Sequence, residues 1–245
     1  MTDPMSVETG VLAAVSPREE ILRTCRLLMA PSDVHEVRCP KTGRRGTISG
    51  YFAQPEALAD AVMRLDGNVP GIYITLNPCR KELLARAANR LRERAEATTS
   101  DADIVRRRWL LLDFDARRPA GISASAAEHG RAMAVACAAW DDLRRMFGDP
   151  VVADSGNGAH LLYRLELSNN QAATALVRRI LAGVAARCGS EDVAVDQTVF
   201  NAARIVKLWG TLACKGDSTP DRPHRRSRLL ELPEDMRILA LQAAA

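Results

Sequence analysis

The sequence has no long apolar run, no paired cysteines and no secretory leader, and each absence excludes a class of protein. No apolar stretch approaches the roughly 20 residues that a membrane-spanning helix needs. The six cysteines form no C-x-x-C pair, which argues against a zinc site or a disulfide framework. The first residues, Met1-Thr2-Asp3-Pro4, lack the basic and apolar regions of a signal peptide. We therefore expect a cytoplasmic protein with reduced cysteines, no zinc and no membrane partner.

Lysine and aromatic residues are also scarce. Among 34 cationic residues only Lys41, Lys81, Lys207 and Lys215 are lysines, so 30 are arginines. Arginine suits phosphate, because its planar fork binds two oxygens at once. Aromatic residues make up 4% of the chain, too few for an extended base-stacking platform. The net charge of +4 is compatible with nucleic-acid binding but does not demand it.

Strand and helix patterns then indicate the fold class, α/β (α+β). The second half alternates two strand pairs with two alanine-rich helices, at 123–146 and 169–188, which predicts a split β-α-β sheet with helices on one face. The first half predicts a smaller α/β unit, with helices beginning at Ser16-Pro17, at 55–65 and at 83–91. A final helix is expected after residue 232. We predict a lead-in and helix at 1–30 and one domain at 31–245, divided near residue 100.

Two carboxylates follow the most apolar strand pattern, Trp109 to Leu112. On a strand, residues two apart point to the same face, so Asp113 and Asp115 should lie side by side. Two buried anions repel each other unless a cation relieves them, and Mg²⁺ prefers carboxylate oxygens. An isolated Asp-x-Asp more often marks a polar strand end, so the interpretation depends on further residues.

Those further residues occur downstream. The turn Ser155–His160 joins two strands and carries two glycines, which could expose backbone N–H groups to an anion, with a histidine beside them. The same turn could equally be a plain hairpin, for which Asn157-Gly158 is a signal. Asp196 ends another short apolar strand. Arg204 and Lys207 follow it, although strand alternation would put those two on opposite faces unless the strand bulges.

In this order the segments resemble the archaeo-eukaryotic primase superfamily, in the primase-polymerase branch found in phages and plasmids. Its first motif, an apolar strand ending in two acids, matches Leu111–Asp115. The second, a serine and glycine segment ending in histidine, matches Ser155–His160, and the third, an apolar-Asp pair, matches Val195-Asp196. The run 201–217 and the strand 71–78 are also similar, and the similarity spans residues 34–232.

The resemblance implies a template-directed nucleotidyltransferase, a DNA primase or DNA polymerase that makes or extends primers for a phage, plasmid or other mobile element. Its fold is a small N-terminal α/β unit packed on a sheet of RNA-recognition-motif type. Residues 31–245 would be the catalytic domain. The implied metal ligands, for two Mg²⁺ or Mn²⁺ ions, are Asp113, Asp115 and Asp196. The implied nucleotide-binding residues, of which His160 is also counted as catalytic, are Ser155, Asn157, His160, Arg204, Lys207 and, with a looser match, Lys215.

The expected partners are a single-stranded DNA template, a primer, nucleoside triphosphates and a replicative helicase in the same or a separate chain. The zinc-binding insert of several cellular members is missing, so another domain or subunit would supply template clamping. Two alternatives stay open: a replication-initiator nickase or other metal nuclease, and a catalytically silent nucleic-acid-binding module. A nickase usually pairs histidines on one strand, whereas the four histidines here are scattered.

Overall fold

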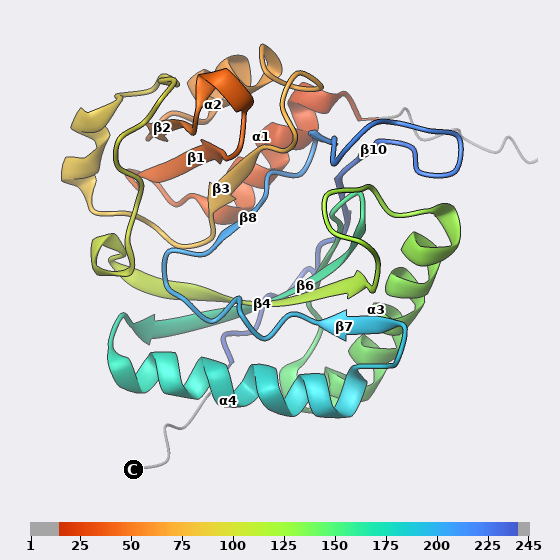
Figure 1. The fold of residues 1–245 in the computed structure, drawn as a ribbon. Coiled ribbons are helices and arrows are strands. Elements are labelled where there is room, and N and C mark those ends of the chain that lie inside the picture. The colour runs from red at the N-terminus through yellow and green to blue at the C-terminus, as the bar shows by residue number, and fades with distance from the viewer. Residues whose placement is uncertain (1–14, 240–245) are drawn as a thin grey trace, which may run out of the picture.

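Two antiparallel sheets form the centre of the protein, which a computed structural model describes over residues 15–239 (Figure 1). The larger sheet has the strand order β11 (Arg228–Glu231), β5 (Val151–Asp154), β6 (Gly158–Ser168), β4 (Arg106–Ala116), β7 (Val193–Val195). The smaller sheet has the order β2 (Ile48–Phe52), β1 (His35–Cys39), β3 (Tyr73–Thr75), β8 (Ile205–Lys207). A short separate pair joins β9 (Leu212–Ala213) and β10 (Arg225–Arg226).

The α-helices of the described chain are α1 (Pro17–Leu28), α2 (Pro55–Met63), α3 (Ala126–Phe147) and α4 (Gln171–Cys188). Short 3-10 helices lie at Gly43–Arg45, Lys81–Arg86 and Asp101–Asp103. Helix α1 begins where the sequence predicts, because the Ser16 hydroxyl accepts the Glu19 N–H at 3.2 Å. Helix α3 begins with a capping box between Ser125 and Glu128. No helix among residues 15–239 is long and apolar enough to cross a membrane.

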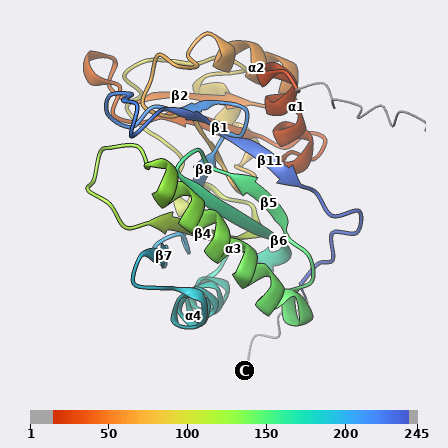
Figure 2. The same cartoon turned by 90° about the vertical axis from the view of Figure 1, so that its right-hand side faces the viewer.

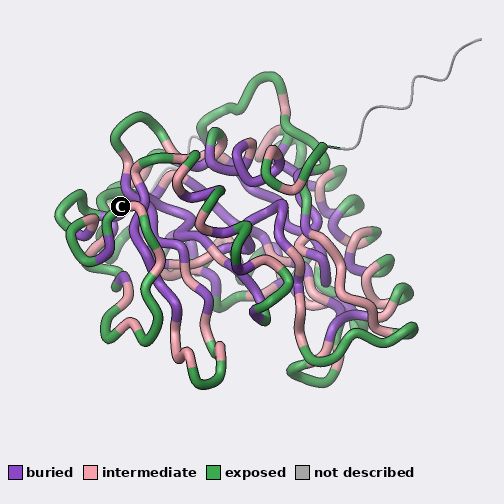
Figure 3. The backbone as a smooth tube through the Cα atoms, turned by 90° about the horizontal axis from the view of Figure 1, so that it is seen from above, coloured by how far each residue is buried: buried purple, intermediate pink, exposed green. Residues whose placement is uncertain are grey.

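The helices lie on the outside and leave the space between the sheets for a cleft. Helices α3 and α4 cover the outer face of the five-stranded sheet, and α1 and α2 pack beside the four-stranded sheet (Figures 1 and 2). Buried residues follow the strands through the middle of the molecule, and exposed residues lie mostly in loops and on the outer faces of the helices (Figure 3). This layering aims the inner faces of both sheets at each other.

The predicted split β-α-β sheet is confirmed. Its elements follow one another as β4, α3, β5, β6, α4 and β7, and the strand order places β4 between β6 and β7. Along β4, Leu110, Leu112 and Phe114 point toward the helices, and the intervening residues point into the cleft. Both faces are therefore buried in the middle of the strand, which explains its uninterrupted apolar run.

Strand pairing crosses the point near residue 100 at which the domain is predicted to divide. Strand β8, far downstream, pairs with β3 and completes the four-stranded sheet. One continuous apolar core runs through both sheets, from Ile21 to Leu239. The segment around Thr99 is bound to the four-stranded sheet, because the Thr99 N–H donates to the buried Glu36 carboxylate of β1 at 2.9 Å. The first half therefore has no complete sheet of its own. Of the predicted lead-in, residues 1–14 lie outside the described residues.

One predicted helix is wrong, and a second is not seen in the residues that the structure describes. In place of a helix at 83–91, a 3-10 helix at Lys81–Arg86 leads into extended backbone that pairs with β2, with Arg92 and Ser49 exchanging hydrogen bonds of 2.8 and 2.9 Å. Gly50 permits this pairing, since a Cβ there would lie 2.0 Å from the Arg90 carbonyl oxygen. The final helix is absent from 233–239, and the rest of that prediction falls outside the described residues.

Candidate active site

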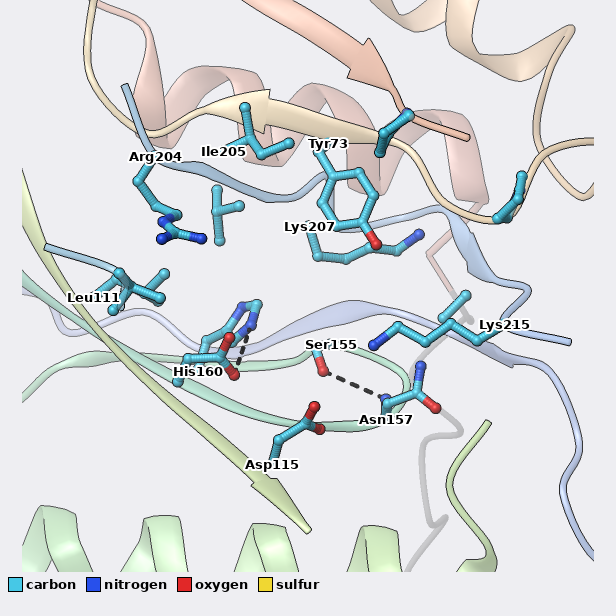
Figure 4. Close-up of a pocket in the computed structure, with 16 residues that line it drawn as sticks. Tyr73, Leu111, Asp115, Ser155, Asn157, His160, Arg204, Ile205, Lys207 and Lys215 are labelled. Carbon is cyan, nitrogen blue, oxygen red and sulfur yellow. Dashed lines mark hydrogen bonds and ion pairs between the residues drawn. The ribbon is translucent and has the colours of Figure 1, made fainter. Parts of the chain in front are cut away.

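A cavity of about 240 Å³ lies between the two sheets and is lined by side chains from both (Figure 4). Strands β4 and β6 and the turn before β6 form one wall, and β3, β8 and the residues beside β8 form the other. Of the nine residues implied by the resemblance, eight line the cavity: Asp113, Asp115, Ser155, Asn157, His160, Arg204, Lys207 and Lys215. The remaining motif residue, Asp196, lies beside the cavity and is described below.

Strand register explains why the acidic residues meet. Asp113 pairs with His160 across the β4–β6 ladder, and Asp115 pairs with Gly158. On the other side of β4, the Asp196 N–H donates to the Asp113 carbonyl at 2.9 Å, which continues the β4–β7 ladder by one pair. Asp196, Asp113 and His160 thus form one row across three strands. Residues directly opposite in antiparallel strands share a face, so the row borders the cleft.

The two β4 carboxylates are electrostatically unlike. Burial raises the pKa of Asp115, and the negative charge of Asp113 raises it further. Burial acts in the same direction on Asp113, but His160, Lys215 and Arg204 together outweigh it, and the pKa of Asp113 is lowered. The His160 Nε2 lies 3.5 Å from Asp113 Oδ1. Asp113 therefore keeps its negative charge to lower pH than Asp115 does.

His160 is fixed by packing and leaves one nitrogen free of protein partners. Its side chain is buried, and its ring meets Trp209 edge-on at a centroid distance of 5.8 Å. Within the described residues, its buried Nδ1 atom has no hydrogen-bond partner. Buried polar atoms are nearly always hydrogen-bonded, so an unpaired nitrogen beside a cavity is consistent with a ligand contact.

The glycine turn does not form the expected backbone anion cradle. The N–H groups of Asn157 and Gly158 donate to the Ser155 hydroxyl, and the Gly156 N–H donates to Asp154 at 2.7 Å. The Ser155 N–H donates to the Gly158 carbonyl at 2.9 Å. Because all four N–H groups are used internally, the turn presents side chains to the cavity and not its backbone donors. Asn157 in turn accepts the Ala124 N–H at 2.8 Å, which fixes the segment before α3.

The cationic residues lie in the same cavity, although strand alternation would put Arg204 and Lys207 on opposite faces of one strand. Arg204 precedes β8 and is held by the turn before it, where its Nε donates to Asn201 at 2.9 Å. Lys207 lies in β8, 4% exposed, and its Nζ donates to the Leu212 carbonyl at 2.7 Å. Burial lowers the pKa of Lys207 to about 8. Arg204, Lys207 and Lys215 all point toward the cavity (Figure 4).

Comparisons with known proteins agree on the architecture. No protein family model matches the sequence, and no curated protein does. The structure is similar to the AEP domain of a cyanophage S-2L primase-polymerase, with a TM-score of 0.55 and 14% identity over 90% of this chain and 93% of that one. It is also similar to the primase RepB′, with a TM-score of 0.51 and 11% identity over 88% of this chain and 56% of that longer one. The chain has the archaeo-eukaryotic primase fold.

The primase fold implies divalent metal ions, and the donor chemistry fits them. Asp113 and Asp115 offer carboxylate oxygens on one face of β4, which is the ligand chemistry that Mg²⁺ prefers. The site is not preassembled, however. Among residues 15–239, no three His, Cys, Asp or Glu side chains are grouped closely enough to hold a metal. The Asp196 carboxylate instead accepts the Thr198 N–H at 2.7 Å. In this arrangement the Asp196 carboxylate is not grouped with the pair.

Two residues of this primase-fold cleft escaped the sequence analysis. Tyr73 of β3 pairs with Lys207 across the sheet, and the Lys207 Nζ lies 5.8 Å from the Tyr73 ring centroid. Strand alternation through 71–76 could have identified it as cleft-facing once Lys207 was placed. Arg118 contacts Asp115, and its only signal in the sequence is a position three residues after that aspartate.

Proposed function

We propose that this chain is a template-directed nucleotidyltransferase, a DNA primase or DNA polymerase that synthesises or extends primers. The observation that carries the proposal is one cleft in which Asp113 and Asp115 on one sheet face Arg204 and Lys207 on the other. Nucleotidyl transfer needs such a division, because anions hold metal ions while cations neutralise the triphosphate. The likeness to a primase-polymerase domain supports it.

The chain's own residues would take these roles. Asp113, Asp115 and, after rotation, Asp196 would hold two Mg²⁺ or Mn²⁺ ions. Bound ions would supply activation of the attacking 3′-hydroxyl and neutralisation of the leaving pyrophosphate. His160, Arg204, Lys207 and Lys215 would hold the triphosphate, and the Ser155–Asn157 turn would shape its pocket. Substrates would be a single-stranded DNA template, a primer and nucleoside triphosphates, in the replication of a phage, plasmid or other mobile element with its helicase.

Primer extension tests the proposal. The purified chain, given primed template, nucleotides and Mn²⁺ or Mg²⁺, is expected to lengthen the primer, and the variant Asp113→Ala with Asp115→Ala is not. Asp141→Ala is the matched control, because it removes an exposed carboxylate of α3 far from the cleft lining. Equal extension by the double variant would refute the proposal. Cleavage of single-stranded DNA without nucleotides would favour a nickase, and DNA binding without either reaction a silent module.

A further inference from the structure

The acidic wall already contains a cation of its own. The Arg118 guanidinium faces both oxygens of Asp115, with Nη1 3.1 Å from Oδ1 and Nη2 3.2 Å from Oδ2. The Arg118 side chain is 5% exposed, whereas the Asp115 side chain is 41% exposed. A two-point contact of this kind occupies the carboxylate plane in which a metal ion would also bind.

Backbone carbonyls fix Arg118 independently of Asp115. Its Nη1 also donates to the Ala116 carbonyl at 3.0 Å, and its Nε donates to the Ile122 carbonyl at 3.3 Å. The guanidinium is therefore held in place, unlike the partners of a typical exposed ion pair. Such a pair contributes little stability, because two flexible side chains must be ordered to form it. It is held at the rim of the cleft by the loop that follows β4.

We propose that Arg118 is an intrinsic counter-cation of the metal site, neutralising Asp115 in the metal-free chain and competing with a divalent cation for its oxygens. The inference rests on the proposed function, since it assumes that Asp113 and Asp115 bind metal. It accounts for the two-point contact by which the buried Arg118 guanidinium engages the more exposed Asp115 carboxylate.

Electrostatics gives the direction of the effect. A divalent ion binds a carboxylate oxygen at about 2.1 Å, and a guanidinium on the same plane would lie close enough to repel it strongly. A bound ion would therefore weaken the two Arg118 contacts by repulsion. Removing the guanidinium removes that competition, and the apparent affinity for metal rises.

Direct titration of the full chain with MnCl2 tests the inference, with free Mn²⁺ measured by electron paramagnetic resonance and no nucleotide or DNA present. For Arg118→Gln the dissociation constant of Mn²⁺ is expected to fall about tenfold, equivalent to ~1.4 kcal/mol. Arg118→Lys keeps the charge without the planar fork and is expected to give a smaller decrease. Thermal unfolding of both variants, without metal, checks that the loop after β4 stays folded.

Arg117→Gln is the matched control. Arg117 is exposed, adjacent in the chain and without an ion pair in the described structure, so its loss changes the net charge equally. Its effect, screened by solvent, is expected to stay below about twofold. Unchanged or weaker Mn²⁺ binding by Arg118→Gln and Arg118→Lys would overturn the inference, since Arg118 would then orient Asp115 for the metal. If one of these two variants fails to fold, the Mn²⁺ affinity of the other tests the inference.

The proposed function fails in a different way. Asp113→Asn with Asp115→Asn is expected to abolish Mn²⁺ binding at this site. Undiminished binding by that double variant would show that the carboxylates are not the metal site, and the proposed function and the inference would fall together. If the double variant loses Mn²⁺ while the Arg118 variants gain nothing, only the inference fails.

Discussion

The two sheets contribute opposite charges to the cleft and reach that result by different structural means. On the five-stranded sheet, long paired strands bring Asp113, Asp115 and His160 together through regular register. On the four-stranded sheet, β8 has only three residues, and the cations depend on the turns on either side of it. The acidic wall is therefore rigid by strand pairing, and the basic wall is held by individual hydrogen bonds. Each difference can be tested by substitution.

The largest expected effect comes from the acidic wall. Asp113→Asn keeps the shape of the side chain but removes the anion nearest His160. Primer extension is expected to fall by about 10³-fold or more, because charge at the reacting centre is lost. Thermal stability should hold or rise, since the repulsion between Asp113 and Asp115 disappears. A fall in melting temperature together with activity would assign Asp113 a structural role.

The next test concerns the register that positions Asp115. A Cβ at Gly158 would lie 2.1 Å from the Phe114 carbonyl oxygen and 2.9 Å from Asp115 Oδ1. Gly158→Ala is expected to cost about 3 kcal/mol in unfolding free energy and to impair activity, because β4 and β6 must separate. Gly130→Ala is the control, because a Cβ added at this exposed position of α3 meets nothing within 4 Å. Its unfolding free energy should increase by up to ~1 kcal/mol, since alanine favours the helix more than glycine does. Denaturant unfolding measures both.

On the basic wall, stability and activity are expected to move in opposite directions. Lys207→Met keeps the volume but removes a buried ammonium group. The apparent KM for nucleotide should rise about tenfold, because one charge facing the triphosphate is lost. Unfolding free energy should increase by up to about 2 kcal/mol, because the native protein no longer has to bury a charge. The Leu212 carbonyl, which loses its hydrogen-bond donor, offsets part of this gain. Loss of stability without a change in KM would remove Lys207 from the nucleotide site.

The smallest expected effect is a pH dependence from the same lysine. With a pKa of about 8, Lys207 is protonated below that pH and loses its charge above it. The value of kcat/KM for nucleotide should therefore fall a few-fold as the pH rises from 7 to 9. Lys207→Arg, which stays charged throughout, should flatten this limb of the profile. The sign for folding is opposite: because the folded pKa lies below the ordinary value of 10.5, stability gains as pH rises from about 8 to 10.5.

Much of the acidic wall could be predicted from the sequence, because it depends on local rules. Alternation along one strand places Asp113 and Asp115 on one face, and the order of strands and helices predicts the split β-α-β sheet. The third carboxylate was placed by resemblance, and the structure puts its backbone, but not its carboxylate, beside Asp113. Whether these residues bind metal and nucleotide remains a prediction.

The remaining features depend on long-range pairing that no local pattern encodes. The helical pattern at 83–91 gave way to pairing with β2, where Gly50 admits a neighbouring backbone. The cation problem at Arg204 disappears because the residue precedes β8 and does not lie in it. The N–H groups of the 155–158 turn, expected to be available to an anion, donate hydrogen bonds to the Ser155 and Asp154 side chains. At 83–91 a partner distant in sequence overrode the local signal, and in the 155–158 turn side chains close in sequence did so.

The late arrival of β8 has a consequence for how the protein is made. Strand β3 pairs with β8 across roughly 130 residues of intervening chain, and a ribosome adding 5–20 residues per second needs about 7–26 s to synthesise them. Until then the β3 edge of the nascent sheet is open, and the wall that carries Lys207 does not exist. The cleft is thus completed only after β8 has been synthesised, when the five-stranded sheet has received all its strands but β11. A chain interrupted before residue 205 would present acidic groups without their cationic counterpart.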